Sequence, residues 1–228
     1  MKYSVSNQEL QIIVGGLLGD AHIRQKYYKG SPCNAHVIFK QGPKQEGYLR
    51  WKAETLEDLI TKSKVRKNKA GQFEFSTKSL PKFNPFVKLF GKPKKITRKM
   101  LNLLDPLGLA VWYMDDGCLA IEYWKRLDGT YRIKRRRIVF STECFSFKEH
   151  RIMKRYFKVV WGIDVTIGSV HKYRTDKDTQ HKIILNYTNA KKLVDIVKPH
   201  IHQDLLYKIN FNHSKNIICD NADPPEKE

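Results

Sequence analysis

Two aspartates, Asp20 and Asp116, each follow an apolar run and precede a small residue. The first run reads IVGGLLGDA at 13–21, and the second reads LAVWYMDDG at 109–117, 96 positions later. If the runs form paired helices, two carboxylates meet at helix C-termini, where helix dipoles and mutual repulsion disfavour negative charge. Divalent cations, above all Mg²⁺, would offset that charge. Metal-bound carboxylates beside a phosphodiester can activate water and stabilise the leaving oxygen, so the pair predicts metal-dependent phosphodiester hydrolysis.

A helix-end role without metal is the alternative for either aspartate taken alone, because such residues commonly make local turn hydrogen bonds. Two matched copies in a strongly basic chain favour the metal site. Gly15 and Gly19 also lie four residues apart, and they leave a bare stripe on which a second helix can approach closely. We therefore expect the two runs to form helices that pack against each other at the centre.

The same order of elements is expected after each run. In the first half we expect strands at 21–28 and 36–40, a helix at 47–59 and strands at 64–66 and 72–77. In the second half we expect strands at 119–124 and 132–141, a helix at 147–160, strands at 165–173 and 182–187 and a helix at 190–198. The fold class is therefore α+β, with duplicated αββαββα halves, each carrying an antiparallel sheet. We divide the chain into 1–100 (first half with connector), 101–219 (second half) and 220–228 (a tail expected to be disordered).

The net charge of the chain predicts a polyanionic partner. Lysine and arginine number 43 against 23 aspartates and glutamates, which gives a formal charge of +20 and a pI near 9.8. Self-repulsion of this size is unfavourable unless a polyanion binds. No apolar run approaches the roughly 20 residues of a membrane-spanning helix, so no membrane partner is expected.

Cationic residues gather on the expected hairpins of both halves. These candidates for DNA contact are Lys64, Arg66, Lys67, Arg132, Lys134, Arg135, Arg136, Arg137, Lys172 and Arg174. Edge-strand lysines that discourage aggregation explain one or two of them, but not clusters in both halves. Because strands alternate faces, Arg132, Lys134 and Arg136 are expected on one face and Arg135 on the other. A two-stranded ribbon fits the major groove of B-DNA, where Arg and Lys bind guanine edges and phosphates, so we predict double-stranded DNA as the partner.

The two runs resemble the paired motifs of the LAGLIDADG homing endonucleases, specifically the single-chain group with two motifs. The second run is the closer match, and the first carries Ala21 where the motif has glycine. Further similar segments are KKIT at 94–97, LDPL at 104–107, STECFS at 141–146, KPHIH at 198–202 and LYKI at 206–209. Together they extend from residue 12 to about residue 212, and their combination is far more specific than any one of them.

The resemblance implies two sheets that form a saddle over DNA and cleavage of both strands across the minor groove, leaving short 3′ overhangs. It also implies metal ligation by Asp20 and Asp116, the eighth motif positions. Gly19 and Asp115 precede them and complete the expected metal set, although Asp115 also suits helix packing or capping. Two or three Mg²⁺ ions shared between the acids are expected, with Mn²⁺ as a substitute.

The resemblance also implies two lysines near the scissile phosphates, which correspond to Lys95 and Lys208. Lys94 is the alternative to Lys95, because the register there is loose, and a solvated surface lysine is an equally good interpretation of Lys94. Such a lysine could orient water or stabilise developing phosphate charge. Glu143 replaces a glutamine of close relatives and could bind metal or water, or weaken phosphate binding. Gln41 is the expected first-half counterpart.

A binding-only protein on the same scaffold, such as an intron RNA maturase, is the competing interpretation. It predicts affinity for DNA or intron RNA without cleavage, whereas the presence of both acids favours the nuclease. One chain already carries both acids, so we expect a monomer on a pseudo-palindromic site. Residues 1–10 lack the apolar core of a signal peptide, and we expect an intracellular protein of an organelle matrix or a prokaryotic cytoplasm, not a secreted one.

Overall fold

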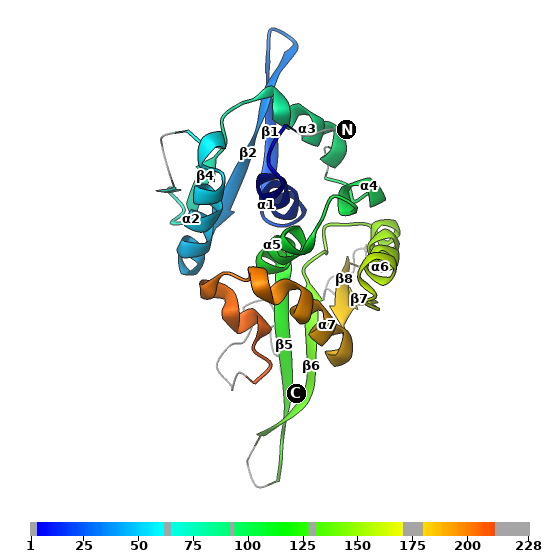
Figure 1. Ribbon diagram of the computed structural model, residues 1–228. Helices are drawn as coiled ribbons and strands as arrows, with labels where there is room; N and C mark the ends of the chain where they lie inside the picture. Colours follow the sequence, from blue (N-terminus) through cyan, green and yellow to red (C-terminus); the bar gives the residue numbers. More distant parts are fainter. Residues whose placement is uncertain (1–3, 62–64, 92–93, 128–130, 171–179, 213–228) are drawn as a thin grey trace.

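The computed structural model describes residues 4–61, 65–91, 94–127, 131–170 and 180–212 (Figure 1). Three of the expected DNA contacts, Lys64, Lys172 and Arg174, lie outside these ranges, and so does the expected tail.

Two four-stranded antiparallel sheets have the same strand order. The first is built from β1 (His22–Tyr28), β2 (Ser31–Gln41), β4 (Phe73–Ser76) and β3 (Arg66–Lys67), in that spatial order. The second is built from β5 (Gly117–Lys125), β6 (Tyr131–Phe140), β8 (Gln180–Leu185) and β7 (Thr166–Val170). The matching order confirms the duplicated α+β fold.

The helices form a central pair and an outer layer. The central pair is α1 (Asn7–Leu18) and α5 (Pro106–Asp116), and the two long hairpins extend from it in opposite directions (Figure 1). The outer helices are α2 (Glu46–Thr55), α3 (Asn84–Phe90), α4 (Arg98–Leu101), α6 (Phe147–Trp161) and α7 (Tyr187–Val197). Short 3₁₀ turns are η1 (Pro43–Gln45), η2 (Glu57–Leu59), η3 (Pro81–Phe83), η4 (Lys198–His200) and η5 (Gln203–Ile209).

Both central helices begin at local capping signals. The Ser6 hydroxyl accepts a hydrogen bond from the backbone N–H of Glu9 at 3.2 Å, and the Glu9 carboxylate accepts one from the Ser6 N–H at 2.6 Å. In α5 the Asp105 carboxylate accepts from the Gly108 N–H at 3.1 Å, just ahead of a proline in the first turn. Each such cap stabilises its helix by about 1 kcal/mol.

The small residues of α1 allow α5 to approach closely, as expected. A Cβ atom on Gly15 would lie 2.5 Å from the Gly108 carbonyl oxygen and 2.8 Å from the Val111 Cβ. A Cβ on Gly19 would lie 2.5 Å from the Cβ of Asp115. The ends of the two helices, and so the two motif aspartates, are therefore brought to the centre of the molecule.

One face of each sheet is covered by helices, and the other is open. In β2 the buried side chains of Ala35, Val37 and Phe39 alternate with the more exposed His36 and Lys40. Helices α2 and α3 contact the covered face of the first sheet, and α6 and α7 contact that of the second. This alternation is typical of an antiparallel sheet with one solvated face. No helix within the described ranges is long and apolar enough to cross a membrane.

Several element boundaries differ from those expected. The helix expected at 47–59 ends at Thr55 and gives way to η2, and the strand expected at 64–66 is the two-residue β3. Helices α3 and α4 were not expected, because segments of seven and four residues are too short to show a helical repeat of apolar residues.

Candidate active site and nucleic-acid interface

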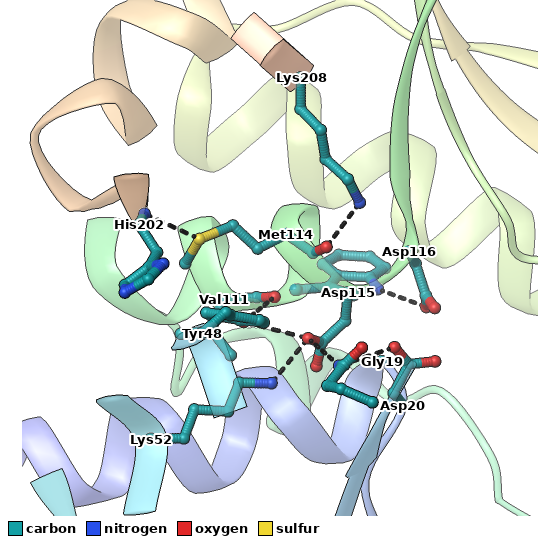
Figure 2. A network of polar contacts seen from close by, with 12 residues as sticks. Gly19, Asp20, Tyr48, Lys52, Val111, Met114, Asp115, Asp116, His202 and Lys208 are labelled. Atoms are coloured by element: carbon teal, nitrogen blue, oxygen red, sulfur yellow. Dashed lines mark hydrogen bonds and ion pairs between the residues drawn. The ribbon is translucent and has the colours of Figure 1, made fainter. Parts of the chain in front are cut away.

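The two motif aspartates lie at the C-terminal ends of α1 and α5 and are held by different partners. Asp20 Oδ2 accepts a hydrogen bond from Gln41 Nε2 at 3.0 Å, and Gln41 ends β2 of the same half. Asp116 Oδ2 accepts a weaker one from Trp112 Nε1 at 3.3 Å, one turn earlier on its own helix (Figure 2). The fold thus brings together the two acids that the repeat predicted.

Burial, and then the crowding of acids, disfavours the charged forms of both aspartates. The pKa of Asp116 is raised to about 8, first by burial and then by Asp20 and Asp115. The pKa of Asp20 is also raised, by burial and then by Asp115, although this residue keeps solvent access. The protein alone therefore does not fully compensate these carboxylates, and a cation between them would favour their ionised forms.

The donor set fits an open divalent-cation site. Asp115 Oδ2 is buried and has no hydrogen-bond partner among the described residues, so one further oxygen at the centre is uncommitted. Within the described ranges, no group of three or more acidic, histidine or cysteine side chains forms a ready metal cage. Mg²⁺ characteristically uses one or two carboxylates and takes its remaining ligands from water and phosphate. Asp20 and Asp116 match that use.

Lys94 closes the C-terminal end of α1. Its ammonium donates to the carbonyl oxygens of Leu17 at 3.1 Å, Leu18 at 3.1 Å and Gly19 at 3.0 Å. A cation at this end is favoured by the helix dipole. Lys95 is exposed. The structure thus brings Lys94, and not its neighbour, to the site. Gly19 was expected in the metal set, and its carbonyl oxygen accepts from Lys94.

Lys208 occupies the corresponding place at the end of α5. Its ammonium donates to the Met114 carbonyl oxygen at 2.6 Å, and the residue is 7% exposed (Figure 2). Burial lowers its pKa, while the acids Asp115, Asp20 and Asp116 act in the opposite direction. A buried cation beside the motif acids is suited to stabilising phosphate charge as it develops.

Asp115 is the centre of a buried network that crosses between the halves. Its side chain is fully buried, and Oδ1 accepts from Lys52 Nζ at 2.7 Å, Tyr48 Oη at 3.0 Å and Gln41 Nε2 at 3.1 Å. Lys52 is only 1% exposed. Neither Lys52 nor Tyr48 stood out in the sequence, since α2 reads as a polar helix and nothing local marks its lysine as buried.

Glu143 lies away from this network, in an ion pair with Lys182 at 2.9 Å. The register of strand pairing makes Thr142, not Glu143, the second-half equivalent of Gln41. Thr142 is fully buried, and its hydroxyl accepts from the Ile183 N–H at 3.2 Å. The second half therefore has no amide in the place that Gln41 occupies in the first.

The basic residues of β6 divide between the two faces of the second sheet. Arg135 and Arg137 both pair with Glu122 of β5, at 3.9 and 2.7 Å, on the open face. Arg136 faces α7, and its guanidinium lies 5.7 Å from the centroid of the Tyr187 ring. The expected separation of Arg135 from Arg136 is observed, and Arg136 is the one directed toward the helices.

Arg132 and Lys134 are both exposed, near the far end of the same hairpin. A β-bulge interrupts the pairing of β5 with β6 beside Glu122, so the simple alternation that grouped these two with Arg136 does not extend along the whole strand.

The open face of the first sheet is also cationic. Arg66 is exposed and pairs with Glu74 at 3.0 Å, whereas Lys67, also exposed, is the next residue of β3 and points to the opposite face. Lys40 pairs with the same glutamate at 3.5 Å, and Arg24 is exposed on β1. Arg24 and Lys40 were not among the expected DNA contacts, although the alternation along β2 is a signal that places Lys40 on the open face.

Solved structures of DNA-bound nucleases share this fold. The homing endonuclease I-WcaI, bound to its DNA recognition sequence, superimposes with a TM-score of 0.69 at 21% identity, covering 91% of this chain and 88% of that one. The LAGLIDADG homing endonuclease I-SmaMI, bound to cleaved DNA, gives 0.58 at 11% identity, covering 88% and 86%. At these identities the likeness concerns the fold alone.

Curated relatives are similar over most of the chain. A protein RecA of Mycolicibacterium flavescens is 24% identical over 91% of this chain and 47% of its own length. The cytochrome b mRNA maturase bI2 of Saccharomyces cerevisiae is 28% identical over 88% of this chain and 47% of its own length. The chain thus spans about half the length of these relatives.

The family match covers most of α1, all of α5, both sheets and the outer helices as far as the middle of α7. It extends over residues 10–193 and so includes Asp20 and Asp116 in their helix-end settings. This chain belongs to the LAGLIDADG DNA endonuclease family.

Proposed function

We propose that the protein is a site-specific endonuclease that hydrolyses both strands of a long double-stranded DNA target with Mg²⁺, leaving short 3′ overhangs. The observation that carries this proposal is the pair Asp20 and Asp116, which end two packed helices between two sheets with open cationic faces. A monomer suffices, because one chain supplies both acids and both sheets.

Asp20 and Asp116 would hold the metal, with Mn²⁺ as a substitute and two or three ions shared between them. Bound Mg²⁺ would supply Lewis-acid stabilisation of the phosphodiester oxygens and favour deprotonation of water. Gln41 and Trp112 each donate a hydrogen bond that helps to position one of the acids. Asp115 would remain in its ion pair with Lys52.

Lys94 and Lys208 would place positive charge near the scissile phosphates, one in each half. Both ammonium groups lie at the ends of the motif helices, next to the acids that determine where the phosphates bind. Preorganised cations stabilise charge that develops in the transition state without reorganising during the reaction. We assign the exposed Lys95 to the DNA backbone instead.

The open sheet faces would bind the two arms of the target. Arg135, Arg137, Arg24, Lys40 and Arg66 lie on or beside these faces. Counterions are released when these cations neutralise DNA phosphates, so the affinity for DNA should fall steeply as the salt concentration rises.

Cleavage selection tests this function. The protein and Mg²⁺ are incubated with a randomised or genomic duplex pool, and the new ends are sequenced, with Asp116→Asn as the control. One long site with staggered 3′ ends, absent from the control, supports the endonuclease. Salt-sensitive binding with no cuts contradicts it.

The second candidate is an intron RNA maturase, favoured by the 28% identity to a protein named as a cytochrome b mRNA maturase. It predicts that the intron RNA of the host gene splices faster in the presence of the protein, and that Asp116→Asn splices as well as the wild type. The same relative leads us to propose an organelle matrix, or a prokaryotic cytoplasm, as the place of action.

A further inference from the structure

The amide of Gln41 is shared between carboxylates of opposite halves. Gln41 Nε2 lies 3.0 Å from Asp20 Oδ2 and 3.1 Å from Asp115 Oδ1. An amide nitrogen carries two hydrogens, and ionised carboxylates only accept, so this nitrogen can serve both acids at once. Rotation of the amide would break both hydrogen bonds and turn its oxygen toward two carboxylates. The position of Asp115 therefore determines the orientation in which the Gln41 amide donates to Asp20.

Asp115 has little freedom to move, because two further first-half residues also donate to its carboxylate. Lys52 and Tyr48 donate to the same Oδ1 atom that accepts from Gln41. The Lys52 ammonium also lies 4.2 Å from the centroid of the Tyr48 ring. All three side chains are essentially excluded from water, and a buried carboxylate without its cation would be strongly unfavourable.

Among the described residues, Asp116 accepts a hydrogen bond from Trp112 of its own helix and none from an amide shared with the other half. The motif position that matches Asp115 in the first half is Gly19, and the strand position that matches Gln41 is Thr142. Thr142 forms hydrogen bonds inside the second half. A Cβ on Gly19 would lie 2.5 Å from that of Asp115, so the helix interface has room for only one of these two side chains.

We propose that Asp115 and Lys52 are positioning residues for one of the two active sites: through Gln41 they orient Asp20, and cutting of the strand that Asp20 serves depends on them more than cutting of the other strand. The inference rests on the proposed endonuclease function and deepens it, since it predicts unequal control of the two strands by one chain.

The first test is strand-resolved cleavage by the double variant Lys52→Met/Asp115→Asn. Removing both charges together avoids an unpaired buried ion, and such replacements are often tolerated. The selected target carries a different fluorophore on each strand, and single-turnover rates are measured with Mg²⁺. We expect the cleavage rate of one strand to fall about tenfold or more relative to that of the other, because a slightly misplaced reacting group slows the reaction by such a factor. Duplex that is nicked always on the same strand should therefore accumulate. The affinity of the double variant for the DNA target, measured with Ca²⁺, should differ from that of the wild type by less than about twofold.

The matched control is Lys158→Met/Asp164→Asn. This pair makes the same two chemical changes at an exposed ion pair of 2.6 Å at the end of α6, on the helical side of the second sheet. Both strand rates should match the wild type. If the double variant of the central pair does not fold, Asp115→Asn alone is tested in the same way, and a strand bias is again required.

The second test needs neither metal nor DNA. The side-chain amide signals of Gln41 are assigned by NMR from their loss in Gln41→Met. Asp115→Asn and Lys52→Met should each shift them, whereas the Lys158→Met/Asp164→Asn control should not. A pair that merely holds the halves together would slow both strands equally and lower the melting temperature, and that outcome, or unmoved Gln41 signals, overturns the proposal. If the wild type cuts no DNA, the endonuclease function fails, while the NMR result still decides whether Asp115 positions Gln41.

Discussion

Lys94 and Lys208 close the two central helices in the same manner. The first donates to the last carbonyl oxygens of α1, and the second donates to the Met114 carbonyl near the end of α5. The pseudo-two-fold repeat therefore extends from the acids to a pair of lysines, the half-buried Lys94 and the buried Lys208, supplied by segments that lie outside the motifs.

Replacing either lysine by methionine should slow cleavage by about 100-fold or more, because each removes a preorganised charge beside the acids. Lys94→Met should also lower the free energy of unfolding by about 1 kcal/mol, since α1 loses the cation at its C-terminus. Single-turnover cleavage and urea unfolding measure the two effects. Lys95→Met is the neighbouring control, and it should mainly reduce the salt dependence of binding. A larger cleavage defect in Lys95→Met than in Lys94→Met would reverse the assignment.

Asp20→Asn and Asp116→Asn should each abolish cleavage while leaving DNA affinity nearly unchanged in Ca²⁺. Asparagine keeps the shape and the acceptor oxygen of each side chain but removes the charge that would bind metal. Gel-shift affinity and cleavage are compared on the selected target. Normal cutting by both variants would show that the active site lies elsewhere.

Stability of the metal-free protein should depend on pH through Asp116. Its pKa is about 8 in the folded protein, against an ordinary value of 3.8. Between these values the folded protein retains a proton that the unfolded chain has lost, so the free energy of unfolding falls as pH rises. For one proton the limiting slope is about 1.4 kcal/mol per pH unit.

Urea unfolding in EDTA across this range measures the slope, and Asp116→Asn should make it shallower. Some slope should remain, because the pKa of Asp20 is raised as well. A slope that is identical in the variant and the wild type would show that Asp116 does not hold the extra proton.

Gly19→Ala should destabilise the protein by about 1–3 kcal/mol, because the added methyl group meets Asp115 at the helix interface. Thermal unfolding provides the measurement. Gly42→Ala is the control, since a Cβ there meets no atom within 4 Å. Equal stability of the two variants would mean that the helix ends can separate without cost.

Arg135 and Arg136 should behave differently although they are neighbours. Arg135→Ala removes a cation from the open face and should weaken DNA binding by about 1–3 kcal/mol if Arg135 contacts a base. Arg136→Ala loses its contact with Tyr187 and should change stability more than affinity. Fluorescence anisotropy with the selected target and urea unfolding separate the two, and an equal loss of affinity in both variants would contradict the division between faces.

The fold could be inferred from sequence because its signals are local and repeated. The glycines of the first motif marked a close helix contact, and the recurring order of elements after each motif indicated two matching sheets. The acids were found in the same way, since Asp20 and Asp116 occupy matched places in the repeat.

The supporting residues could not be inferred, because their environment is created by tertiary contacts. Lys52 lies in a polar helix and becomes buried only when Asp115 of the other half meets it. Lys94 and Lys95 are adjacent in a segment without periodicity, so nothing local distinguishes the capping lysine from the exposed one. Likewise, Thr142 matches Gln41 only through the strand register, which the sequence does not reveal.

The contact of Gly19 with Asp115 limits how such a protein can arise and be re-engineered. In a symmetric homodimer the same residue occupies both sides of the axis, so a central carboxylate would meet its own copy where there is room for one side chain. The Asp115 network therefore requires two halves of different sequence, which this single polypeptide supplies. For the same reason, a hybrid that joins this second half to an unrelated first half would bury an aspartate without its lysine, and should require Asp115 to be replaced before it folds.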